Sequence, residues 1–200
     1  PYADRIMIMV MGEAAARDVA FRNKEIDTSI LGPAQYVAYR ADPELSQGIL
    51  EVAEVFTRTM AMNPAFKPFS DKRVRQAINH AMDTDLIIKR LVRDKAYRAV
   101  SWLPMASPAF DKGMKPYAFD PEKAKKLLAE AGYPNGFEVQ LDCPNNRYVN
   151  DEKICQAVTA MWTKIGVNTR LVTMPRAQYF PKLEKLDTSL YMLGWGGAST

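Results

Sequence analysis

The segment from Phe119 to Leu141, FDPEKAKKLLAEAGYPNGFEVQL, constrains the fold most, because it specifies a helix, both helix ends and a following strand. Asp120 is suited to cap the helix, and Pro121 suits the first turn, where its missing N–H costs nothing. Gly132 fits the left-handed position just past the helix end. The apolar residues at helical spacing are Ala124, Leu127, Leu128 and Ala131, and those that alternate as in a strand are Phe137, Val139 and Leu141.

The rest of the chain also alternates between predicted strands and predicted helices. Strands are predicted at residues 6–11, 26–31, 49–62, 167–172 and 190–193. Helices are predicted at residues 13–24, 34–40, 70 or 71 to 82, 83 or 84 to 92, 150–164 and 176–186. Residues 97–117 contain three prolines and are expected to form a loop. Strands and helices that alternate at these lengths predict an α/β architecture.

Composition and length are those of an ordinary globular protein. The 200 residues suit one large domain or two small ones, with 48% apolar and 25% charged residues. No apolar run approaches the 18 or so residues of a membrane-spanning helix. The first residues, PYADRIMIMVMG, lack the basic start and cleavage site of a signal peptide, so we expect them to form a strand.

The positive charge is concentrated in residues 67–98, which hold nine basic and four acidic side chains, a net of +5 against +4 for the whole chain. Two helices joined by a short turn could read DNA, but Asp83 and Asp85 in that turn would face phosphate groups. We therefore expect a solvated helix face and no nucleic-acid partner. A docking face for a protein partner is the weaker alternative.

Residues for catalysis or metal binding are scarce. The lone histidine, His80, lies in the middle of a predicted helix and is interpreted as structural. No serine stands in a Gly-x-Ser-x-Gly turn, and no glycine-rich phosphate loop precedes a helix. We therefore expect no catalytic residue, no metal and no cofactor, and predict that the chain is not an enzyme. A stand-alone α/β enzyme, the alternative, would need a closed sheet and a deep polar pocket.

Two cysteines, Cys143 and Cys155, lie twelve positions apart, at a predicted strand end and inside a predicted helix. They are too few for a disulfide framework, and a pair of buried thiols is favoured over a bridge.

Four segments occur in the order found in one known family. They are Asn63 followed by PFSDKRVRQAINHAMDTDLIIKRL (68–91), the opening segment at 119–141, RYVNDEKICQAVTAMWTKIGVNTRL (147–171), and LGWGG (193–197). Together they resemble the peptide and nickel class of extracytoplasmic solute-binding proteins, which deliver ligands to ABC importers. The resemblance covers nearly the whole chain.

This resemblance implies a mixed sheet flanked by helices, forming one lobe of a two-lobed periplasmic binding protein. Residues 1–200 would be most of the C-terminal lobe, since a string similar to PYADRI opens that lobe in the family. The first lobe and the end of the second would then be missing. A periplasmic or extracytoplasmic monomer is implied, with a signal peptide on the full-length protein. Its partners would be a small-molecule or peptide ligand and the ABC permease subunits in the membrane.

The loop at residues 145–150 is the first candidate ligand site, because it joins a strand end to a helix start. The helix N-terminus and Arg147 both suit a carboxylate, which arginine can bind with two hydrogen bonds. In dipeptide receptors of the family, an arginine and a tyrosine of the matching loop bind near the ligand carboxylate. Asn146, Arg147 and Tyr148 are therefore candidate contacts, although the tyrosine spacing differs by one residue. In the alternative, Asn150 caps the helix and Arg147 is only a surface residue.

A second candidate site is formed by Trp195, Gly196 and Gly197, which offer a flat apolar wall beside accessible backbone. Peptide receptors of the family have an aspartate for the ligand ammonium where this chain has Ala198. The difference favours a longer or modified peptide, or a non-peptide ligand. A core tryptophan is the structural alternative. Trp102 lies in a loop similar to one near the family's cleft, and a purely structural loop is the alternative there.

The resemblance predicts a ligand-binding lobe that serves an importer of peptides or peptide-like solutes. Receptors for nickel complexes, opines or sugars remain alternatives within the same family. A sensor lobe that accompanies the DNA-binding domain of a transcriptional regulator is the alternative outside it. An N-terminal helix-turn-helix in the full gene product would support that alternative, and a signal peptide would exclude it.

Overall fold

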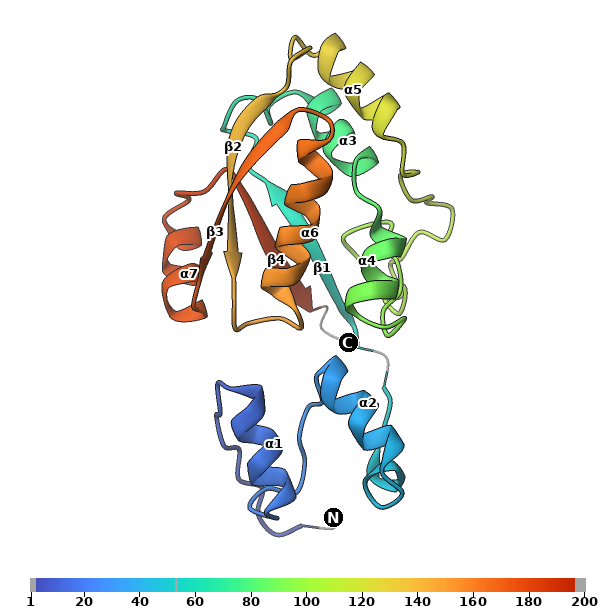
Figure 1. Cartoon of the computed structure of the whole chain (residues 1–200), viewed down its shortest axis with the longest axis vertical. Helices are drawn as coiled ribbons and strands as arrows, with labels where there is room; N and C mark the ends of the chain where they lie inside the picture. The colour runs from blue at the N-terminus through green and yellow to red at the C-terminus, as the bar shows by residue number, and fades with distance from the viewer. Residues whose placement is uncertain (1–2, 53, 197–200) are drawn as a thin grey trace. The chain divides into compact units, whose positions relative to one another are not determined.

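The computed structural model describes residues 3–52 and 54–196 (Figure 1). The chain divides into two compact units, residues 1–51 and residues 52–200, and each is described by itself. Within the described residues, none of the helices has the length and apolar character needed to cross a membrane.

The first unit is built from short helices. Its elements are α1 (Ala14–Arg22), α2 (Pro33–Ala41) and the 3-10 helix η1 (Leu45–Gly48). Tyr39 joins the two α-helices, because its hydroxyl donates to the Asp18 carboxylate at 2.5 Å and its ring lies 6.1 Å from that of Phe21. Among the described residues of this unit, Tyr39 and Ala20 are the buried ones, so its core is small.

The strands predicted at 6–11 and 26–31 are wrong, and the strand predicted from residue 49 begins only at Phe56. Ile6, Ile8 and Val10 are more than four-fifths exposed, at 83%, 85% and 81%. A strand needs a neighbour to pair its backbone N–H and C=O groups. No described segment pairs with these residues, so their apolar pattern alone does not make them strands.

The second unit contains a four-stranded sheet in the order β1-β4-β2-β3 (Figure 1). The strands are β1 (Phe56–Met62), β2 (Phe137–Pro144), β3 (Val167–Met174) and β4 (Leu190–Gly196). Strand β1 is antiparallel to β4, whereas β2 is parallel to both β3 and β4. The predicted mixed sheet is therefore confirmed, and it is open, with β1 and β3 as its edges.

Five helices accompany this sheet, and their starts follow the sequence signals. They are α3 (Lys72–His80), α4 (Thr84–Leu91), α5 (Pro121–Glu130), α6 (Asp151–Thr163) and α7 (Arg176–Glu184). Asp71, Asp83 and Asp120 cap α3, α4 and α5, each accepting a backbone N–H with its carboxylate. Gly132 has a φ of 92° after α5, as its position past the helix end predicts. Residues 97–117 form the expected loop.

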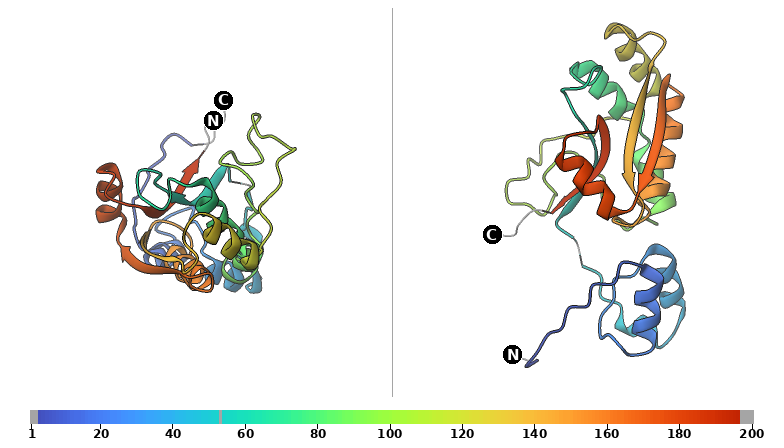
Figure 2. Two further views of the ribbon diagram at one scale, coloured as in Figure 1. Left: turned by 90° about the horizontal axis from the view of Figure 1, so that it is seen from above. Right: turned by 90° about the vertical axis from the view of Figure 1, so that its left-hand side faces the viewer.

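Helices α6 and α7 cover opposite faces of the sheet (Figure 2). Trp162 of α6 is fully buried, and its indole N–H donates to the Ile78 carbonyl of α3 at 3.2 Å. This hydrogen bond connects α3 to α6. The largest fully buried side chains are Trp162, Tyr179, Phe69, Ile78, Leu128, Leu141, Leu190 and Met192.

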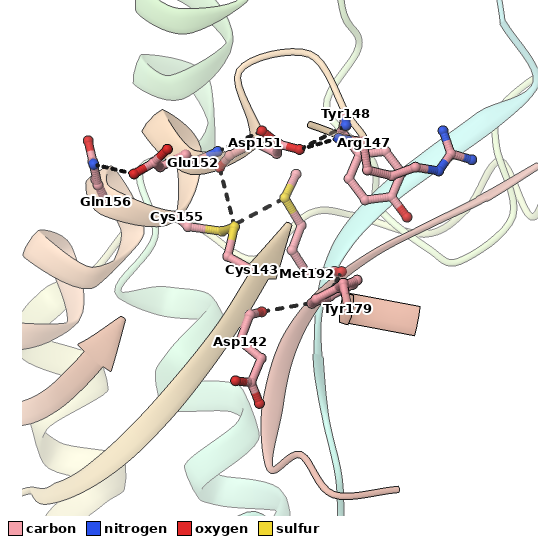
Figure 3. The surroundings of a disulfide bond; sticks show 10 residues. All are labelled: Asp142, Cys143, Arg147, Tyr148, Asp151, Glu152, Cys155, Gln156, Tyr179 and Met192. Carbon is pink, nitrogen blue, oxygen red and sulfur yellow. Dashed lines mark hydrogen bonds between the residues drawn. A yellow bond between two sulfur atoms is a disulfide. The ribbon is translucent and has the colours of Figure 1, made fainter. Parts of the chain in front are cut away.

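The two cysteines form a disulfide bond, and the favoured interpretation as separate thiols is wrong (Figure 3). Cys143 is the next-to-last residue of β2 and Cys155 lies in the second turn of α6, with both fully buried. Strand β2 and helix α6 pack against each other, which brings the two side chains together across the loop at residues 145–150. The spacing along the chain could not reveal that contact.

Reduction of the disulfide is expected to lower the free energy of unfolding by about 3 kcal/mol, because the bond closes a short loop in the unfolded chain. Urea denaturation with and without dithiothreitol measures the difference. The double variant Cys143→Ala/Cys155→Ala serves as a control that should not respond to the reductant. Equal stability of the oxidised and reduced protein, with two free thiols titrated after reduction, would contradict this expectation.

Tyr179 of α7 predicts a loss of stability in alkaline solution. Its hydroxyl is buried and donates to the Met192 carbonyl, and burial raises its pKa well above the usual value near 10. The folded state therefore holds this proton more tightly than the unfolded state, and stability falls as the pH rises above about 10. Absorbance titration should show at least one of the nine tyrosines ionising only as the protein unfolds. Ionisation of all nine with an unchanged circular dichroism spectrum would contradict it.

Candidate functional site

The loop between β2 and α6 is organised by Asp151, the first residue of α6 (Figure 3). Its buried carboxylate accepts the backbone N–H groups of Arg147 and Tyr148, each at 2.9 Å. The structural alternative expected Asn150 to cap α6. Its side chain makes no capping hydrogen bond to the helix. Its amide instead donates to the Leu91 carbonyl at 2.6 Å, which ties the loop to α4. The loop is therefore held from two sides.

Tyr148 connects this loop to the neighbouring strands. Its ring is buried beside that of Phe56, with centroids 6.2 Å apart, and its hydroxyl accepts the Gly194 N–H at 2.9 Å. A Cβ at Gly194 would lie 2.3 Å from the Phe56 ring and 2.8 Å from the Tyr148 ring. Only glycine fits at this position, because both rings lie directly against its backbone.

Arg147 lies exposed on the outer side of Tyr148, with its guanidinium carbon 4.9 Å from the ring centre. Across the described part of the chain, no ion pair engages this guanidinium, so it is available to an anion from solution. Asn146 has a structural role, since its side-chain oxygen accepts the Arg176 N–H at the start of α7 at 2.8 Å.

Two further residues of this site, Phe56 and Arg58 of β1, were missed by sequence reasoning. The guanidinium carbon of Arg58 lies 4.9 Å from the Phe56 ring centre, and Arg58 stands opposite Gly194 in the strand pairing. No motif marks either residue, because only the pairing of β1 with β4 brings them to Tyr148.

Trp195 is 60% exposed at the end of β4, so within the described residues it is not a core side chain. It pairs with Thr57 of β1, and its side chain alternates to the face of the sheet opposite Gly194 and Tyr148. The structure thus brings Arg147, Tyr148 and the backbone of Gly194 and Gly196 to one end of the sheet. The indole lies on the other face of that end. Gly197 and Ala198 lie outside the described residues.

Trp102 is 46% exposed in the loop of residues 97–117. Both views of Figure 2 place this loop and the end of β4 on the same side of the unit. Arg98 anchors the loop through an ion pair with Asp85 at 2.7 Å. Among the described residues, no hydrogen bond or ring contact joins Trp102 to Arg147 or Trp195.

His80 is structural, since it is buried and its Nδ1–H donates to the Ala118 carbonyl at 2.7 Å. An open cavity of about 320 Å³ beside it is lined by Gln76, His80, Lys115, Tyr117, Lys123 and Leu127, among others. It lies between α3 and α5, which Figure 1 places at the opposite end of the sheet from the Tyr148 loop. Within the part of the chain that the structure describes, no cluster of three acidic, histidine or cysteine side chains is arranged for a metal ion.

Comparison with known proteins gives a single family. The family model for bacterial extracellular solute-binding proteins, family 5 Middle, matches residues 1–200. Heme-binding protein A of Haemophilus influenzae is 32% identical over 199 residues, which are 97% of this chain and 36% of that protein. The dipeptide-binding protein of Escherichia coli is 27% identical over 201 residues, which are 98% of this chain and 37% of that protein.

Solved structures agree with these relatives. The periplasmic binding protein DppA of Helicobacter pylori, in complex with the peptide STSA, has a TM-score of 0.81 at 25% identity and aligns with 94% of this chain and 36% of that one. The dipeptide-binding protein of a Pseudoalteromonas strain, in complex with Met-Leu, has a TM-score of 0.79 at 28% identity, covering 94% and 37%. The predicted lobe of the peptide-binding class is therefore confirmed as the fold. The chain spans little more than a third of the length of these relatives.

Tyr148→Phe is expected to destabilise the second unit by about 1–3 kcal/mol, because the Gly194 N–H loses its acceptor in a partly buried position. The Gly194 amide resonance should shift, and urea denaturation should report the loss. Tyr97→Phe, at a tyrosine that is 79% exposed, is the matched control and should leave stability unchanged. Equal stability of the two variants would mean that the Tyr148 hydroxyl does not hold β4 in place.

Proposed function

The chain belongs to the bacterial extracellular solute-binding proteins of family 5, and we propose that it forms a ligand-binding lobe for an ABC importer of peptides or peptide-like solutes. The family is a non-enzymatic component of transport, which confirms the prediction that the chain is not an enzyme. In this function the ligand binds between two lobes, and closure presents it to the permease in the membrane. Closure requires that the ligand bind the closed state more tightly than the open one.

The observation that carries this proposal is the exposed guanidinium of Arg147, stacked on a tyrosine that is itself bonded to β4. A receptor for many peptides must recognise backbone and end groups rather than side chains. A guanidinium binds the terminal carboxylate with two hydrogen bonds, and the stacking on Tyr148 limits the conformations that must be ordered on binding. The backbone at the end of β4, around Gly196, is exposed and can offer hydrogen bonds to the peptide backbone.

The relatives support peptides as the ligand class without making it unique. Both solved structures compared above hold a peptide, and the Escherichia coli relative is a dipeptide-binding protein. Other relatives are described as binding heme or glutathione, or are solved with a nickel–histidine complex or opines. Peptides are favoured here because these relatives bind them, and Arg147 suits their terminal carboxylate as it suits other carboxylate ligands. Ala198 offers no carboxylate to a ligand ammonium group, which favours longer or modified peptides over dipeptides.

The disulfide supports an extracytoplasmic location for this lobe. Disulfide bonds persist in oxidising compartments such as the bacterial periplasm and are rare where thiols are kept reduced. We propose that the full-length protein is a periplasmic monomer that carries a signal peptide and docks to permease subunits. A regulator that uses this lobe as a sensor beside a DNA-binding domain would not need the oxidised bond.

NMR titration of the ¹⁵N-labelled chain with the tripeptide Ala-Ala-Ala tests the proposal. Binding should perturb the Gly194 amide and be weaker than micromolar, because one lobe supplies only part of the contacts. Arg147→Ala should weaken it at least about tenfold, as expected for loss of a charge-assisted hydrogen bond. Amidation of the peptide C-terminus should have the same effect.

Arg170→Ala is the matched control, since Arg170 is exposed on β3, away from the loop. Equal affinity for the free and amidated peptides would contradict the proposed binding of the terminal carboxylate by Arg147. Micromolar or tighter binding by the 200-residue chain alone would refute the proposal that this lobe supplies only part of the ligand contacts. Absence of any binding at millimolar peptide would leave peptides without support as the ligand class.

A further inference from the structure

We propose that Arg58 of β1 is a second anion contact of the ligand site, which makes this lobe select peptides that carry an acidic side chain besides their terminal carboxylate. The inference rests on the proposed function. It is carried by the position of Arg58 against the Phe56 ring, which neighbours the Tyr148 ring that Arg147 contacts, an arrangement that only the folded sheet creates.

Four side chains from two separate segments form one continuous row. Arg147 lies 4.9 Å from the centre of the Tyr148 ring, Tyr148 lies 6.2 Å from Phe56, and Arg58 lies 4.9 Å from Phe56. An aromatic pair therefore lies between two guanidinium groups. Each guanidinium is oriented by the ring that it contacts, which reduces the entropy lost when it binds a ligand.

The strand pairing places Arg58 and the two aromatic rings on one face of the sheet. Arg58 stands directly opposite Gly194, and directly paired residues of antiparallel strands have side chains on the same face. The rings of Phe56 and Tyr148 both lie against Gly194 on that face. Arg58 is therefore a neighbour of Gly194 from β1, and Tyr148, whose ring Arg147 contacts, is its neighbour from the β2–α6 loop.

The charges of this cluster favour an anionic ligand. Asp151, the nearby buried carboxylate, is already occupied by three backbone N–H groups of its own loop and helix start. Arg58 pairs with Glu54 through one contact of 3.2 Å, and the two side chains are 34% and 68% exposed. A solvent-exposed pair of this kind is weak, and within residues 3–52 and 54–196 this single contact leaves other N–H donors of the guanidinium free.

A purely structural role for Arg58 would consist of covering the Phe56 ring. That role predicts that loss of the guanidinium loosens Phe56 and Tyr148 and weakens every peptide to the same degree. The proposed role predicts a loss only for peptides with an acidic side chain. The ratio of two dissociation constants therefore separates the two roles.

The experiment compares the tripeptides Ala-Asp-Ala and Ala-Ala-Asp with their asparagine counterparts, by NMR titration of the ¹⁵N-labelled chain. The wild-type chain is expected to prefer at least one aspartate peptide by about tenfold. Arg58→Met keeps an unbranched side chain over Phe56 but removes the charge, and should abolish the preference by weakening the aspartate peptide far more than the asparagine peptide. Glu54→Gln frees Arg58 and should increase the preference a few-fold.

The possible results separate this inference from the proposed function. Binding of the aspartate and asparagine peptides with equal affinity, while Arg147→Ala still weakens both, would overturn the role of Arg58 alone. Equal weakening of both peptides by Arg58→Met would reduce Arg58 to a packing residue. Failure of all four peptides to bind would refute the proposed function and this inference with it. Arg170→Ala should leave both affinities and their ratio unchanged.

Discussion

The hydrogen bond from the Gly194 N–H to the Tyr148 hydroxyl joins β4 to the loop that follows β2, and the candidate site depends on it. Among the residues that the structure describes, strands β2 and β4 pair directly at two positions, Leu141 with Leu190 and Asp142 with Tyr191. Beyond those pairs the strands are connected through side chains. The Tyr148 hydroxyl provides that connection at the end of the sheet where Arg147 is exposed.

The loop that carries Arg147 is rigid for reasons that act together. The disulfide joins its two flanking elements, β2 and α6, and the Asp151 carboxylate fixes its backbone. An exposed arginine ordinarily loses much side-chain entropy when it binds a ligand. The fixed backbone of Arg147 and the Tyr148 ring beside its guanidinium reduce that loss. Such an arrangement suits a receptor that must bind ligands of varied sequence through the same few groups.

Much of the second unit could be predicted locally. Asp120, Pro121 and Gly132 specify the ends of α5 through hydrogen bonds and backbone angles within a few residues, so no distant partner is needed. The strands expected at 6–11 and 26–31 failed because a strand forms only against another strand. Arg147 and Tyr148 could be proposed from a resemblance and a strand–helix junction. Phe56 and Arg58 could not, because their place in the site comes from pairing between segments far apart in sequence.

The sequence by itself determined the helix boundaries, the α/β class and the likeness to one family, because caps, periodicity and motif order are short-range properties. Only the tertiary structure decided that Cys143 and Cys155 form a bond, that Trp195 lies on the opposite face from Tyr148, and that two arginines flank one aromatic pair. Each of these depends on which strands are neighbours and in which register. A shift of one residue in that register would turn every side chain of a strand to the other face.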